Sequence, residues 1–134
     1  MNLPIEGRVV CSVEVSGFVP FLRLHFWGTP GVPNSTTGPD YTLQIEGPLR
    51  IDVGGTVWNI VPESGADPAY LRLIDKKVAR AIAAVDGGLD VVFTDGDRLV
   101  IPPHAYEPWQ LSGDDESLVV SVAGGGLAVW DGSG

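Results

Sequence analysis

The chain has a single cysteine, Cys11, among its 134 residues, so no disulfide can form within it. No apolar run approaches the ~20 residues of a membrane-spanning helix, and residues 1–7 lack the basic-then-apolar layout of a signal peptide. Lysine and arginine are scarce, with 8 against 17 aspartates and glutamates, which gives a formal net charge of −9. Such a surface repels phosphate backbones. We therefore expect an acidic cytoplasmic protein that binds neither nucleic acid nor a membrane.

The residue patterns that carry most catalytic chemistry are equally sparse. The two histidines, His25 and His104, have no second histidine or cysteine at a metal-ligand spacing. Asp86 and Asp95 each precede a glycine, which is typical of hairpin turns, and their spacing does not fit a calcium-binding loop. Residues 124–126 are glycines but lack the Lys-Ser/Thr that follows in a phosphate-binding loop. The sequence therefore predicts no metal, no cofactor and no catalytic residues.

The residues that are abundant indicate a mainly β protein. Hydrophobic residues make up 44% of the chain, which is enough to form the core of a single domain at residues 1–134. Residues 28–40 are too polar to pack and should form a mobile loop, and residues 131–134 should fray. Alternating apolar residues bounded by Gly, Pro and Asp predict strands at residues 9–15, 22–26, 41–45, 49–53, 78–85, 89–93, 99–101, 109–111, 118–122 and 127–130.

One short helix is predicted at about residues 67–77. Asp67 stands before Pro68, as an N-cap stands before a proline in the first helical position. Lys76 and Lys77 would fall in the last turn, where the helix dipole favours cations. Because isolated helices of this length are marginally stable in water, we expect it to lie against a sheet.

The order of the strands suggests a degenerate internal repeat, with half-repeats at residues 5–61 and 73–130. In this alignment Val9 is equivalent to Val78, and a Leu-x-Leu-x-Phe strand in the first half matches a Leu-x-Val-x-Phe strand in the second. Chance is the other explanation, because alternating apolar triplets are common in β proteins. Two antiparallel meanders that each bury one face would pack as a sandwich or a partly open barrel, with the helix connecting them.

The aromatic residues offer the best candidates for a binding surface. Trp and Tyr concentrate binding energy at interfaces, and several of them cluster with acidic residues toward the C-terminus. Packing in the core and at its rim is the other explanation for the same residues. The candidate binding residues are Tyr106, Glu107, Trp109, Trp130 and the acidic turn Asp114, Asp115 and Glu116.

The chain resembles an uncharacterised family of small proteins from high-GC Gram-positive bacteria. Four segments carry the resemblance: residues 45–48 (IEGP), 95–103 (DGDRLVIPP), 106–113 (YEPWQLSG) and 124–130 (GGGLAVW). The chain departs from the family at Ser121 and Ala123, where a cysteine and a proline are often found, so cysteine chemistry is not available at that position. The resemblance implies no activity, because none is assigned to the family. By analogy, small acidic proteins of such bacteria are often immunity proteins that neutralise a toxin.

Three functional hypotheses follow from these observations. The first is a non-catalytic protein-binding module, in particular an immunity or antitoxin-type inhibitor whose acidic surface steers it toward a basic partner. The second is a ligand-binding protein or enzyme with a pocket between the two meanders, where Glu46, Asp97, His104 and Glu107 would converge. The third is a self-associating structural protein, since unpaired sheet edges can join two copies into a homodimer.

Overall fold

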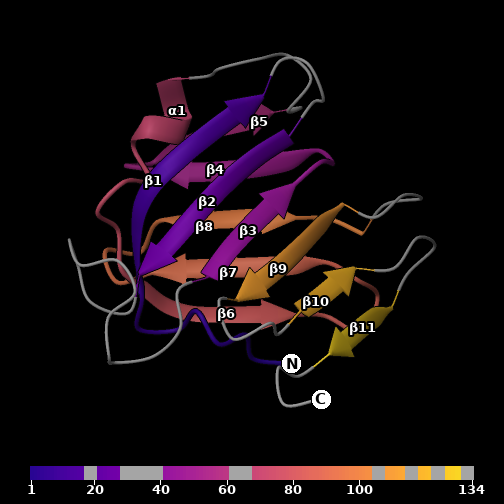
Figure 1. The fold of residues 1–134 in the computed structure, drawn as a ribbon. Coiled ribbons are helices and arrows are strands. Elements are labelled where there is room, and N and C mark those ends of the chain that lie inside the picture. Colours follow the sequence, from indigo (N-terminus) through magenta and orange to yellow (C-terminus); the bar gives the residue numbers. More distant parts are fainter. Residues whose placement is uncertain are drawn as a thin grey trace.

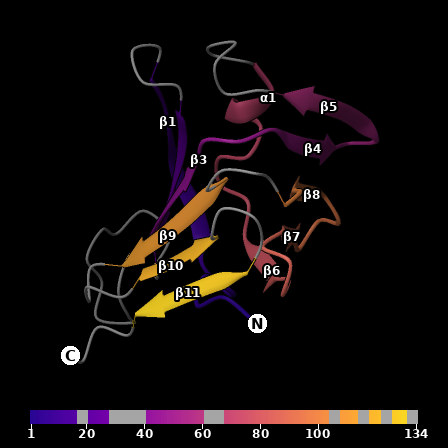
Figure 2. The same ribbon diagram turned by 90° about the vertical axis from the view of Figure 1, so that its right-hand side faces the viewer.

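The computed structural model describes residues 1–16, 21–27, 41–60, 68–103, 108–113, 118–121 and 126–130. The strands form two antiparallel sheets packed face to face (Figure 1). Figure 2, turned by 90°, shows β9, β10 and β11 of one sheet beside β6, β7 and β8 of the other. The predicted mainly β fold of two packed antiparallel sheets is therefore confirmed. The regions predicted as a mobile loop, residues 28–40, and as a frayed tail, residues 131–134, lie outside the described residues.

The elements have the following bounds. In spatial order the six-stranded sheet consists of β1 (Val9–Ser16), β2 (Phe21–Trp27), β3 (Tyr41–Ile45), β9 (Trp109–Gly113), β10 (Leu118–Ser121) and β11 (Leu127–Trp130). The five-stranded sheet consists of β5 (Thr56–Ile60), β4 (Leu49–Val53), β8 (Arg98–Ile101), β7 (Leu89–Phe93) and β6 (Val78–Ala83). A single turn of helix, α1 (Pro68–Leu71), precedes β6. No helix in these segments is long or apolar enough to cross a lipid bilayer.

The core lies between the two sheets and follows the alternation of the sequence. In β3 and β7 every second residue is buried, because successive side chains of a strand point to opposite faces. The buried residues of both sheets form one continuous apolar cluster. The largest of its side chains that are less than 2% exposed are Trp109, Tyr70, Phe26 and Phe93. The inward faces of both sheets are therefore used for packing, and the outward faces are left for other contacts.

Each sheet combines strands from both halves of the chain. The first half forms β1, β2 and β3 in one sheet and then β4 and β5 in the other, and the second half forms β6, β7 and β8 before it returns to the first sheet with β9, β10 and β11. The halves meet where β3 pairs with β9 and where β4 pairs with β8. The two sheets have equivalent strand orders in which the halves have changed places: β1-β2-β3-β9-β10 in one corresponds to β6-β7-β8-β4-β5 in the other. Among the described strands, β11 alone has no counterpart.

The residue pairing is also equivalent in the two halves. Strand β2 meets β3 in the same register as β7 meets β8. At the junctions between the halves, Leu43 lies opposite Leu111, and the equivalent residues Leu99 and Ile51 lie opposite each other. This arrangement is the one that two copies of a meander produce when each copy completes the other's sheet.

A β-bulge interrupts the first strand of each half at the same place. The pairing of β1 with β2 shifts between Val10 and Ser12, and that of β6 with β7 shifts between Val78 and Arg80. These bulges make Val10 the equivalent of Val78, so the sequence alignment that equated Val9 with Val78 is one residue out of register. Periodicity could not locate the bulge, because the extra residue changes the phase of the alternation within a single strand.

The segments that lead into β1 and β6 cross and hold each other through equivalent hydrogen bonds. Val10 N donates to Lys76 O at 3.0 Å, and Val78 N donates to Arg8 O at 2.9 Å. Each first strand is thus anchored by the segment that precedes the other. The two halves are therefore linked at this corner as well as through the β3–β9 and β4–β8 pairs.

The same crossing requires two residues in the left-handed backbone region. Gly7 N donates to Val78 O and Asp75 N donates to Val10 O, both at 2.8 Å. Gly7 has a φ of 85° and Asp75 a φ of 71°, and Asp75 is the only non-glycine residue with a positive φ in the described segments. An L-residue in this region is strained, and glycine is not. The second half therefore carries a strain that the first half avoids.

The helix is shorter than predicted. Instead of residues 67–77, only Pro68–Leu71 is helical, and a turn follows up to Asp75. After the left-handed residue Asp75, Lys76 and Lys77 continue as an extended segment, with Lys77 forming a β-bridge to Val9. The two lysines therefore do not interact with a helix C-terminus.

We expect Gly7→Ala and Asp75→Gly to have different effects on stability. No atom lies within 4 Å of a Cβ added at Gly7, so Gly7→Ala changes only the backbone strain. It should lower the free energy of unfolding by about 1 kcal/mol. Asp75→Gly relieves the same strain and should leave stability within about 0.5 kcal/mol, because greater freedom of the unfolded chain offsets the gain. Urea denaturation measures both, and a neutral Gly7→Ala would contradict this account.

Candidate functional site

Most of the binding residues predicted from the sequence cannot be placed. Tyr106, Glu107, Asp114, Asp115 and Glu116 lie outside the described residues. The backbone of Trp130 ends β11, opposite Leu118 of β10. Of the predicted residues, the structure therefore gives a full account of Trp109 alone.

Trp109 is part of the core. Its side chain is 1% exposed, and its Nε1 donates a hydrogen bond to Gly87 O at 2.9 Å. Ser121 Oγ donates to the same oxygen at 2.8 Å. These bonds attach the β6–β7 turn to β9 and β10, and a Cβ added at Gly87 would lie 2.7 Å from Ser121 Oγ. This burial argues against the predicted binding role, because Trp109 cannot contact a partner unless the core opens.

The pocket residues of the second hypothesis do not form a site in the described segments. His104 and Glu107 lie outside them. Glu46 is exposed between β3 and β4. Asp97 accepts a hydrogen bond from Gly54 N at 3.1 Å and forms an ion pair with Lys76 at 2.7 Å. No group of three or more His, Cys, Asp or Glu side chains in the described part could hold a metal ion.

Lys76 forms ion pairs with both Asp95 and Asp97, and we call these three residues the ion cluster. The side chain of Lys76 is 14% exposed, and its ammonium contacts both carboxylates. Burial by itself would lower the pKa of Lys76, but hydrogen bonds and attraction to Asp95 and Asp97 raise it above 10.5. The hydrogen bond from Lys76 lowers the pKa of Asp95 below 3.8. The cluster attaches the segment before β6 to the β7–β8 turn.

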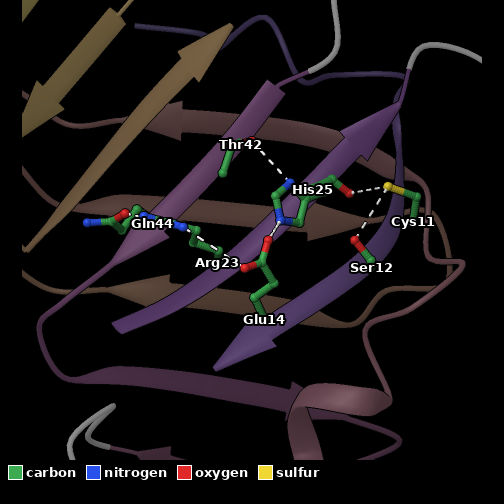
Figure 3. Close-up of polar contacts among 7 residues, drawn as sticks. All are labelled: Cys11, Ser12, Glu14, Arg23, His25, Thr42 and Gln44. Atoms are coloured by element: carbon green, nitrogen blue, oxygen red, sulfur yellow. Dashed lines mark hydrogen bonds and ion pairs between the residues drawn. The ribbon is translucent and has the colours of Figure 1, made fainter. Parts of the chain in front are cut away.

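A different group of polar side chains lies together on the outer face of the six-stranded sheet. Figure 3 shows His25 of β2 between Glu14 of β1 and Thr42 of β3. His25 Nδ1 is 3.1 Å from Thr42 Oγ1, and Nε2 is hydrogen-bonded to Glu14 Oε1. In the next row, Arg23 Nε donates to Gln44 Oε1 at 2.8 Å, and the Arg23 guanidinium pairs with Glu14 at 4.0 Å.

These contacts are cross-strand neighbours, which the antiparallel register brings together. Arg23 is opposite Glu14 on one side and Gln44 on the other, and His25 is opposite Ser12 and Thr42. The two rows continue onto β9, where Gln110 is opposite Gln44 and Ser112 is opposite Thr42. We call this surface the polar face; its residues are Ser12, Glu14, Arg23, His25, Thr42, Gln44, Gln110 and Ser112.

The order carboxylate, imidazole, hydroxyl has the polarity of a catalytic triad. The imidazole of His25 is hydrogen-bonded through Nε2 to the Glu14 carboxylate and through Nδ1 to the Thr42 hydroxyl. Acyl transfer also needs free N–H donors for the developing oxyanion. Strand β3 is paired on both sides, with β2 and β9, so the amides around Thr42 belong to the sheet.

Sequence reasoning missed the polar face because it treated each strand separately. It considered His25 only as a metal ligand and found no second histidine or cysteine at a suitable spacing. The available signal was the polar phase of three consecutive strands, which carries Glu14, Arg23, His25, Thr42 and Gln44. Pairing those strands as an antiparallel meander places these residues in two adjacent rows.

Comparison with known proteins identifies a family without an assigned function. A family model described as "Family of unknown function (DUF6188)" matches residues 1–131, which include every strand of both sheets. Neither a curated protein nor a solved structure matches the chain.

We expect the ion cluster to make stability depend on pH at both extremes. Because the pKa of Asp95 is lower in the folded state, its contribution is present above pH 3.8 and is lost as the pH falls through the depressed value. Because the pKa of Lys76 is raised, its contribution is present below pH 10.5 and is lost as the pH rises through the raised value.

Lys76→Met tests this dependence. The difference in the free energy of unfolding between wild type and variant should be largest at neutral pH and should shrink toward both extremes. Lys77→Met, at the exposed neighbouring lysine, is the matched control and should show no such profile. Denaturant titrations across the pH range provide the measurement, and a difference that does not vary with pH would contradict the assignment.

Proposed function

The chain belongs to the family of unknown function DUF6188, and from the geometry we propose that it is a non-catalytic protein-binding module whose polar face contacts the partner. The observation that carries the proposal is that no described helix or strand covers this face (Figure 1). Five of its eight side chains, those of Glu14, Arg23, His25, Thr42 and Gln44, are nevertheless linked to one another by hydrogen bonds and ion pairs. A surface whose side chains are partly exposed and already ordered is suited to recognition.

The order of the polar face lowers the cost of binding. Immobilising a flexible side chain at an interface costs about 0.5–1.5 kcal/mol. Arg23 and His25 are already fixed through their bonds to Gln44, Thr42 and Glu14, with 38% and 26% of their side chains exposed. Arginine is among the residues that contribute most at protein interfaces. Arg23 and His25 are therefore the residues we expect to contribute most to the affinity.

The distribution of charge supports a basic partner. All 8 lysines and arginines lie in the described segments, together with nine of the 17 acidic residues, so these segments are nearly neutral. The other eight carboxylates, which account for most of the net charge, are Asp40, Glu63, Asp67, Glu107, Asp114, Asp115, Glu116 and Asp131. A negative field raises the rate of association with a basic partner more than the final affinity.

More specifically, we propose that the protein is an immunity or antitoxin-type inhibitor that acts in the cytoplasm. What supports this form is the combination of small size and a net charge of −9 with the ordered side chains of the polar face. Neutralising a toxin requires no chemistry from the inhibitor, because occupying the toxin's surface is sufficient. The partner would then be a basic protein that is harmful to the cell when it is expressed alone.

We expect Arg23→Ala to weaken partner binding by about tenfold or more, the loss typical of an interface hot spot. The partner is captured from the source cells with wild type as bait, identified, purified and measured by calorimetry. Arg80→Ala removes an exposed guanidinium from the outer face of the other sheet and is the matched control. Its affinity should equal that of wild type, and the association rate of wild type should fall as salt is added.

Two further readouts separate the alternatives. Co-expression of the chain with the captured protein should restore growth if the partner is a toxin. Equal affinity of Arg23→Ala and Arg80→Ala would overturn the assignment of the polar face. Capture of nothing but a second copy of the chain, with a dimer mass by light scattering, would overturn the proposal in favour of the self-associating protein.

A further inference from the structure

A groove of about 340 Å³ lies at the end of the five-stranded sheet where β4 begins and β5 and β8 end. Outward-facing residues line it together with the buried side chains of Leu49 and Ile60. Its walls are apolar and are formed by Pro48, Ile60, Val100 and Pro102, while Arg50 and Asn59 supply the polar groups. This volume is at the lower end of the ~300–1,000 Å³ range of small-molecule sites. We propose that the groove binds a small carboxylic acid with an apolar body, whose carboxylate pairs with Arg50.

Arg50 is the reason for choosing a carboxylate. Its side chain is exposed and makes no hydrogen bond or ion pair with any described residue, whereas Arg98, two residues from Val100 on the neighbouring strand, is bound to Asp90 in a bidentate ion pair. A planar guanidinium binds a carboxylate through two parallel hydrogen bonds. Asn59 lies opposite Arg50 in the β4–β5 pair and can donate a further bond to the same group.

The walls of the groove are suited to an apolar body. Pro48 and Pro102 form part of its rim, and the fixed φ of proline makes both walls rigid before the ligand arrives. Ile60 and Val100 provide the branched apolar surface between them. An anion without an apolar part would leave this surface exposed to water, so the structure selects against simple inorganic anions.

The equivalent positions in the other half of the chain differ from the groove. The strand pairing makes Gln110 the equivalent of Arg50 and Trp109 the equivalent of Leu49, which also lines the groove. Leu49 and Trp109 are both buried in the core, so the two positions differ mainly in charge, because Gln110 carries none. The cation of Arg50, which has no partner among the described residues, is therefore not repeated at the equivalent position of the other half.

The proposed test measures the binding of 3-phenylpropionate by NMR shifts and calorimetry, with the uncharged amide 3-phenylpropanamide as a matched ligand. The carboxylate should bind and shift the resonances of Arg50, Asn59 and Val100, and the amide should bind about tenfold more weakly or worse. Arg50→Gln should abolish the difference between the two ligands. Arg80→Gln, which removes an exposed guanidinium elsewhere on the same face, should leave the binding unchanged.

A second variant tests the groove independently of the charge. Val100→Phe should fill the groove and weaken carboxylate binding while Arg50 stays in place. Equal binding of acid and amide, no binding at millimolar concentration, or binding that Arg50→Gln does not change would overturn the proposal. So would tight binding of phosphate or sulfate at the same site. Arg50→Gln should still bind the protein partner of the polar face, which keeps this test separate from the proposed function.

Discussion

The structure depends on the fact that neither half of the chain can complete a sheet. Each half contributes three strands to one sheet and its remaining strands to the other. The strands of the two halves are joined by the β3–β9 pair in the six-stranded sheet and by the β4–β8 pair in the five-stranded sheet. The apolar faces of both layers are buried against each other only when both junctions have formed. The crossing of the segments before β1 and β6 adds hydrogen bonds between the halves. Folding should therefore be cooperative across the whole chain.

The sequence predicted the fold class because the alternation of apolar residues is local and was read correctly in most strands. The length of the helix and the register of the strands were harder to predict, because they involve contacts between residues far apart in the sequence. The helix ends at Leu71, and the end of the segment that was predicted to continue it is bound to β1 instead, since Asp75 N donates to Val10 O, which is 65 positions away. The bulges after Val10 and Val78 shift the pairing by one residue, and only the partner strand reveals them.

The site was harder to predict for the same reason. Aromatic residues near acidic turns are enriched at interfaces, but Trp109 shares the inward phase of its strand with Leu111, and that phase placed it in the core. The pairing that joins Glu14, His25 and Thr42 requires the order and register of three strands. The amino-acid composition gives the net charge of the chain, but the polar face can be located only from the register in which β1, β2 and β3 pair.

Internal symmetry gives a way to separate packing from function in this fold. Where both halves need the same interaction, as at the two bulges and at the crossing of residues 7–10 with residues 75–78, the backbone contacts are repeated. Where the halves differ, the shared fold does not require a particular side chain, and the side chains at those positions can serve binding. Glu14, Arg23 and His25 correspond by this pairing to Ile82, Asp90 and Val92, so the linked rows of the polar face have no copy on the second sheet. The polar face and Arg50 therefore both lie at positions where the two halves of the chain differ, in the six-stranded and the five-stranded sheet respectively, and their outward-facing side chains can vary without changing the backbone contacts that the halves have in common.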